Sequence, residues 1–196
     1  MGGAVSLDFV NTLDDRFSNE PKEMLKSYVD LARFGEDTGI LTDQQVDRIF
    51  PWSIQYPEEA QEALKSAIEL REAISEIFYA IVQRKPVPAA PLAKLNSVVQ
   101  EAAKHLTLVP GKRRFEWKFS SGIDDPYASI WPIARDAAEL LASDRLEFVR
   151  ACASKTCEWL FLDESKNHGR RWCDMTKCGN RAKAKRFYVR QKKEAN

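Results

Sequence analysis

Apolar residues recur at intervals of three and four through most of the first 144 residues, which is the spacing of one helix face. The longest such stretch follows Pro57 and covers residues 58–84, where it predicts the central core helix. Shorter stretches predict helices over residues 24–34, 43–50, 92–102 and 126–142. Thr42 and Gln45 form a capping box for the second of these, and Pro51 is predicted to end it.

The apolar period changes from about 3.6 to 2 between residues 105 and 119, and a turn signal at residues 110–112 divides this stretch. The pattern predicts a β-hairpin with Phe115, Trp117 and Phe119 on one face. Residues 5–13 predict a short buried element that turns at Asn11. We therefore expect residues 1–144 to form a mainly helical domain with a small antiparallel hairpin, so that the whole chain is α+β.

The C-terminal residues follow a different pattern. Residues 145–151 and 158–163 read as two strands, residues 165–172 as a basic loop and a return strand, and a final helix is expected from Cys178. A knuckle, a hairpin and a helix in this order resemble a treble clef. We predict that residues 145–196 form a separate small module.

All four cysteines of the chain lie in this module, as Cys152, Cys157, Cys173 and Cys178. Four residues separate the members of each pair, and fifteen separate the pairs, which is a spacing typical of one structural Zn²⁺ ion held by four thiolates. Two disulfides, or buried thiols that only pack, are the alternatives. The first residues lack the charged and long apolar regions of a secretion signal, so we expect reduced thiols in a cytoplasmic protein.

Charge is divided unevenly along the chain. The net charge is +1 overall, but residues 150–196 carry +8 and the remaining residues carry −7. An acidic body with a basic tail indicates that the tail binds a polyanion. Two or three cations would suffice to offset the local charge of about −2 on a zinc ion with four thiolates, and the tail has more than that.

If that polyanion is duplex DNA, the final helix is predicted to enter its major groove. Asn180 and Arg181 at its N-terminal end are predicted to approach bases. The predicted phosphate contacts on the helix are Lys183, Lys185, Arg186 and Arg190, and the preceding loop adds Lys166, Arg170 and Arg171.

These residues resemble the CGNR zinc-finger family, whose name is the tetrapeptide found here at residues 178–181. The similarity extends to Cys157–Asp163, Ser165–Asn167, Arg170–Met175 and the basic run through Arg186. Leu7–Thr12, with the sequence LDFVNT, resembles the ABATE domain that usually precedes this finger. The resemblance implies a bacterial, stress-induced transcription regulator, with a finger that binds DNA and a body that binds an unidentified small ligand.

Other functions remain open at this stage. The basic tail could dock an acidic protein partner or RNA, because charge alone does not distinguish these from DNA. An enzyme is disfavoured, since the sequence offers no recognisable pair of catalytic carboxylates, no phosphate loop and two histidines. No apolar run approaches the length of a membrane span. We expect the body to form a homodimer, because one small finger would bind DNA weakly. We also expect a ligand pocket between the long helix and the hairpin.

Overall fold

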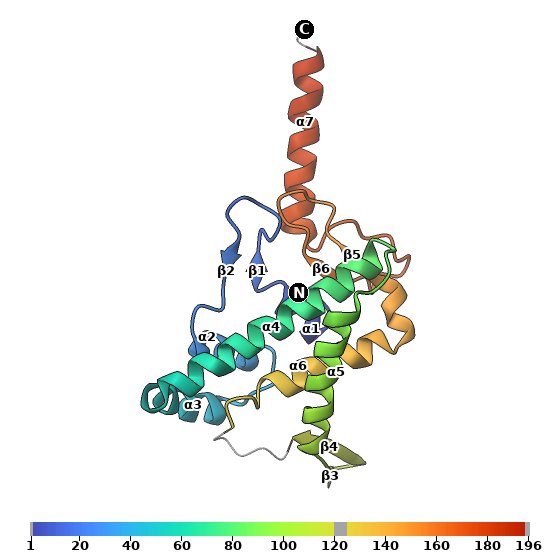
Figure 1. Ribbon diagram of the computed structural model, residues 1–196. Helices are drawn as coiled ribbons and strands as arrows, with labels where there is room; N and C mark the ends of the chain where they lie inside the picture. The colour runs from blue at the N-terminus through green and yellow to red at the C-terminus, as the bar shows by residue number, and fades with distance from the viewer. Residues whose placement is uncertain (1, 120–124, 195–196) are drawn as a thin grey trace.

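The computed structural model describes residues 2–119 and 125–194; the side chains of residues 186, 188–190 and 192–194 lie outside the description. Its helices are α1 (Val5–Val10), α2 (Tyr28–Asp37), α3 (Asp43–Gln55), α4 (Pro57–Val82), α5 (Ala89–Lys104), α6 (Ile130–Leu141) and α7 (Asn180–Glu194) (Figure 1). A 3-10 turn covers Asp144–Phe148 and a π-helical turn covers Met175–Gly179. The described strands pair antiparallel, β1 (Leu13–Asp14) with β2 (Lys22–Glu23), β3 (Leu106–Pro110) with β4 (Phe115–Phe119), and β5 (Val149–Ala151) with β6 (Leu160–Leu162). The predicted α+β class is confirmed.

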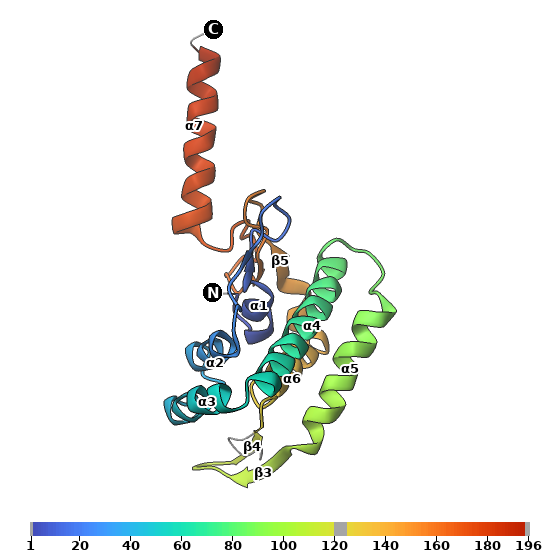
Figure 2. The same ribbon diagram turned by 60° about the vertical axis from the view of Figure 1, so that its left-hand side comes forward.

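Helix α4 is the centre of the body, and α5 runs beside it in both views (Figures 1 and 2). Ala60, Ala63 and Ala67 are buried along one side of α4, where small side chains let neighbouring helices approach closely. The larger core residues of the same helix are Leu70, Ile74, Ile77 and Phe78, each at most 1% exposed. Burying each of these side chains contributes about 1.5–3 kcal/mol, so packing rather than helix propensity stabilises α4.

Helix α1 lies where the body meets the C-terminal module. It packs against α4 and α6 on one side and against β6 on the other. Leu7 and Phe9 are fully buried, and the Ser6 amide donates to the Asp136 carboxylate of α6 at 2.7 Å. This short helix therefore joins the two ends of the chain.

The sheet of the C-terminal module shares the core of the body. Val149, Leu160 and Leu162 belong to the same buried apolar cluster as Leu7 and Phe9. The predicted domain boundary between residues 144 and 145 stays a prediction, but the two parts pack as neighbours without an open linker. Helix α7 is different, because it projects away from the rest of the molecule (Figures 1 and 2).

The prediction that Pro51 ends its helix is wrong. Helix α3 continues for a further turn to Gln55, although proline supplies no N–H donor there. Trp52 in this extra turn packs between Tyr28 and Tyr56, with ring centroids 5.6 and 5.7 Å away. Aromatic packing thus outweighs the one lost hydrogen bond.

The β3–β4 hairpin forms as predicted, with Trp117 paired opposite Leu108. Its aromatic face is open to solvent, since Phe115 and Trp117 are 64% and 56% exposed. The hairpin lies at the end of the molecule opposite α7 (Figures 1 and 2).

Arg71 of α4 is the largest polar side chain buried in the body, at 2% exposed. Its guanidinium donates two hydrogen bonds of 2.7 Å to the Glu23 carboxylate of β2 and one of 2.9 Å to Glu72. Arg16 also pairs with Glu72 and donates to the Val10 carbonyl oxygen. Arg71 is thus buried with its charge paired.

This network predicts an acid-sensitive contribution to stability. Burial opposes ionisation of Glu23, but the hydrogen bonds and charge of Arg71 together with the backbone amides of Leu25 and Met24 outweigh it, and the pKa of Glu23 falls below its ordinary value of 4.5. A lowered folded-state pKa gives stability that is present above pH 4.5 and is lost as the pH falls through the folded value. Glu23→Gln should cost on the order of 2 kcal/mol at pH 7 and less below pH 4, measured by urea unfolding at both pH values.

The matched control is Glu20→Gln, which neutralises an exposed carboxylate in the same connection. Equal losses of stability in the two variants, or a loss for Glu23→Gln that does not change with pH, would contradict this account.

Candidate metal centre

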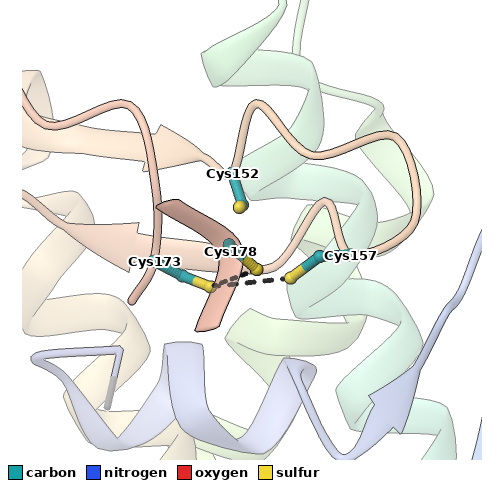
Figure 3. Close-up of side chains that lie close together, drawn as sticks. All are labelled: Cys152, Cys157, Cys173 and Cys178. Carbon is teal, nitrogen blue, oxygen red and sulfur yellow. Dashed lines mark hydrogen bonds between the residues drawn. The ribbon is translucent and has the colours of Figure 1, made fainter. Parts of the chain in front are cut away.

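The first two cysteines flank a tight turn between β5 and β6. Cys152 directly follows β5, and its amide donates to the Trp159 carbonyl oxygen at 2.8 Å. The amides of Cys157 and Glu158 both donate to the Ser154 carbonyl oxygen, at 3.0 and 3.1 Å, which closes the turn. Both thiols therefore point to the same side of the sheet, toward the second pair (Figure 3).

The second pair is placed by the turn that precedes α7. Asp174 caps this turn, since its carboxylate accepts from the amides of Thr176 and Lys177 at 2.7 and 3.3 Å. At Gly179 a Cβ atom would lie 2.8 Å from the Met175 sulfur and 3.4 Å from the Trp172 ring, so only glycine fits without displacing a neighbour. Gly179 therefore lets the turn that carries Cys178 pack directly on Met175 and Trp172.

The four sulfur atoms meet at one point. They lie within 4.8 Å of one another, with 3.5 Å between Cys157 and Cys173 and 3.8 Å between Cys173 and Cys178 (Figure 3). A tetrahedral zinc ion with Zn–S bonds of about 2.3 Å requires S–S edges of about 3.8 Å. The predicted ligands thus fit one Zn²⁺ ion, and four thiolates leave no open position for a catalytic water. Zinc here supplies a structural cross-link.

The thiols also show why a cation is required. Hydrogen bonding from Cys157 lowers the pKa of Cys152 to about 2, so this sulfur ionises first. Sharing a hydrogen bond with the Cys152 sulfur raises the pKa of Cys173 to about 12 and that of Cys157 well above its ordinary range. Negative charge on Cys152 opposes ionisation of Cys173, and negative charge on Cys173 opposes ionisation of Cys157; a bound divalent ion would remove that opposition.

A small core and one buried carboxylate support the metal loops. Phe161 is fully buried and packs with the cysteines, Trp159 and Trp172, and together these residues form a small core. The fully buried Asp163 accepts from the amides of Ser165 and Arg170, at 3.1 and 2.8 Å. The predicted return strand within residues 165–172 is absent from the described structure, because these bonds hold the segment as a loop.

The contact between body and finger depends on Asn11, the cap residue of α1. Its side-chain amide donates to the Leu160 carbonyl oxygen at 2.8 Å, and its side-chain oxygen accepts from the Leu160 amide at 3.0 Å. Two further bonds cross the same boundary, from the Trp159 indole to Asp14 at 2.7 Å and from the Tyr79 hydroxyl to the Glu158 carbonyl oxygen at 2.8 Å. The sequence predicted only a turn at Asn11; the one available signal for a larger role was an asparagine just after a buried apolar run.

The residues predicted to contact bases are engaged within the finger. Asn180 donates to the Thr176 carbonyl oxygen at 3.0 Å, and Arg181 donates to the Thr156 hydroxyl at 3.1 Å. Both side chains remain exposed. Their contact with bases stays a prediction.

The predicted phosphate contacts divide into two groups. The half-buried Arg170 turns inward, donating to the Cys173 carbonyl oxygen at 2.6 Å and stacking over Phe161. Arg171 lies over the Trp172 ring and is exposed. Lys166, Lys183 and Lys185 are exposed, whereas the side chains of Arg186 and Arg190 lie outside the described part of the structure. The structure therefore places an open set of cations around the finger.

Comparison with known families agrees with this geometry. The model of the ABATE family, described as a putative stress-induced transcription regulator, matches residues 3–144, and that of the CGNR zinc finger matches residues 149–191. The chain belongs to the ABATE family. It is a regulator of that family with a C-terminal CGNR zinc finger and a site for one zinc ion. No curated protein matches the chain.

Both matched families are of regulatory or zinc-finger type. None of the described helices is long and apolar enough to cross a membrane. In the ABATE part, a groove of about 530 Å³ lies between α4, α5 and α6, where Ser66, His105 and Trp131 line it. None of the described hairpin residues 106–119 lines this groove, so a ligand pocket between the long helix and the hairpin stays a prediction.

Zinc should be required for the finger but not for the body. We expect purified protein to contain one zinc per chain by elemental analysis, and Cys178→Ser to lose it, because three thiolates bind zinc far more weakly than four. Circular dichroism should then show partial loss of helix and tertiary signal, with α4 and α5 retained. Lys177→Gln is the control, since it changes an exposed side chain of the same turn without removing a ligand. A fully folded, zinc-free wild-type chain would refute the metal centre.

Asn11→Ala should loosen the finger from the ABATE part. It leaves the buried amide and carbonyl groups of Leu160 without partners, which costs roughly 2–4 kcal/mol. Asn11→Asp keeps the acceptor and loses the donor, so it should be intermediate or worse if its charge stays buried. Thermal unfolding and amide exchange at Leu160 measure both effects, with zinc content as the control for an intact finger. Wild-type exchange in Asn11→Ala would contradict the assignment.

Proposed function

We propose that this ABATE-family regulator binds duplex DNA through its CGNR finger, with the zinc centre fixing the orientation of α7 and of the basic loop before it. The observation that carries the proposal is the form of α7. This helix projects from the molecule (Figure 1), and residues 180–193 contain no aspartate or glutamate. Arg181, Lys183 and Lys185 are exposed along its first turns.

Electrostatics favour a polyanion over a purely structural role for these cations. The metal centre carries about −2, and the inward Arg170 already stands next to it. The exposed cations of α7 are additional to that requirement. A solvated helix would normally mix acidic and basic side chains, whereas this helix presents one sign of charge.

The finger is also held firmly enough to present α7 in a defined direction. Bonds from Asn11, Asp14 and Tyr79 tie the strand side of the finger to the body. Rigid presentation lowers the entropy lost on binding. The same connections support the second part of the proposal, in which a small ligand bound in the groove between α4, α5 and α6 regulates the finger; a thermal shift with a panel of metabolites tests for such a ligand.

Salt dependence tests DNA binding directly. Each phosphate contact releases counterions, so log K for zinc-loaded protein and labelled duplex should fall linearly with log salt concentration. Arg186→Ala with Arg190→Ala should reduce the slope by about 2. The matched control is Arg113→Ala with Arg114→Ala, two exposed arginines in the hairpin turn at the far end of the molecule (Figure 1).

An unchanged slope in the α7 double variant would remove this part of the helix from the interface. No binding of the wild-type protein to duplex DNA at low salt would overturn the proposal. If RNA or an acidic protein displaces duplex DNA from the finger, that competitor becomes the proposed partner of the same basic surface.

A further inference from the structure

A groove of about 340 Å³ runs along the finger between the first cysteine turn and the start of α7. Lys155 enters it from the cysteine turn, Arg171 from the loop before Cys173, and Arg181 and Lys185 from α7. Three segments that are distant in sequence thus supply four cations to one depression. Lys155 was not among the residues predicted to contact DNA.

The lining of this groove has one sign of charge. It includes no aspartate or glutamate, and within the described residues none of the four cations forms an ion pair. All four side chains are exposed, so an anion can reach them without any rearrangement of the core. An unpaired cluster of this kind attracts a polyanion strongly at low salt.

The chemistry of the groove wall narrows the choice of anion. The half-buried Trp172 contributes an apolar ring, and Arg171 is stacked over it with its guanidinium carbon 5.5 Å from the ring centroid. Cations beside an apolar surface suit a chain that alternates phosphates with sugars. An isolated phosphate ion would contact the cations but leave the Trp172 ring exposed to water.

The helix terminus does not provide a competing anion site. Asp174 already accepts from the amides of Thr176 and Lys177 at the start of the turn before α7. A phosphate there would meet a carboxylate instead of free N–H groups. The groove formed by side chains is therefore the better anion site of the finger.

We propose that this groove binds the sugar-phosphate backbone of one DNA strand. Lys155, Arg171 and Lys185 contact phosphates, while Arg181 lines the groove and stays hydrogen-bonded to Thr156. The inference rests on the proposed function and makes it more specific, because only one side of α7 faces the groove. Arg181, Ala182 and Lys185 line it and Lys183 does not. We therefore predict that Lys185 contributes more to DNA binding than Lys183, which lies on the same helix.

Single alanine variants test this difference in fluorescence anisotropy with labelled duplex DNA across a range of salt concentrations. Lys155→Ala and Lys185→Ala should each lower the salt slope by about 1 and weaken binding roughly 5- to 10-fold at 0.1 M salt. Lys183→Ala, which removes the same charge from the same helix outside the groove, should change the slope by much less. Lys112→Ala in the hairpin turn controls for net charge. All four side chains are exposed, and the zinc content of each variant verifies the fold.

The outcomes separate the two proposals. If wild-type protein shows no salt-dependent binding to duplex DNA, the proposed function fails. If it binds, but Lys155→Ala behaves like Lys112→Ala while Lys183→Ala and Lys185→Ala weaken binding equally, DNA binding stands and the groove is excluded as the path of the strand.

Discussion

The paired hydrogen bonds between Asn11 and the backbone of Leu160 are the constraint on which the arrangement of the molecule depends. They lie in a buried position, where an unpaired amide or carbonyl group would cost about 1–3 kcal/mol. Asn11 caps the short helix α1, which packs on the body, and Leu160 belongs to β6, which carries the finger. Pairing these groups fixes the position of α1 relative to β6. The ABATE part and the zinc finger consequently share one apolar cluster, so the finger is packed directly on the body.

The residues of the CGNR tetrapeptide, 178–181, also have structural roles within the finger. Cys178 is a metal ligand, Gly179 permits close packing on Met175, and Asn180 and Arg181 bond to the Thr176 carbonyl and the Thr156 hydroxyl. Each of the four residues therefore contributes to the shape of the finger. Arg181 contributes both to this shape and to the charge of the groove, while Lys155 and Lys185 add exposed cations around the framework.

Sequence patterns predicted the helices, the hairpin and the four metal ligands because each is encoded by local spacing. The features that were missed depend on partners far away in the chain. Asn11 meets a strand 149 residues later, and Arg71 is buried because Glu23 reaches it from β2. Pro51 did not end its helix because Trp52 found two aromatic neighbours. Local rules gave the wrong return strand for a similar reason, since the buried Asp163 bonds the amides that a strand would have paired.

Rigid joining also limits how a signal in the body could reach α7. The groove in the body includes Ser66 of α4, while Tyr79 on the same helix bonds to Glu158 in the finger. Thirteen residues of helix separate them, or about 20 Å at 1.5 Å per residue. A packed helix of this kind moves as a body, so an event at one end is transmitted as a shift or tilt and not as a local loosening. Its effect on the finger would pass through the bonds of Tyr79 and Asn11, and their strength sets how much of any shift α7 receives.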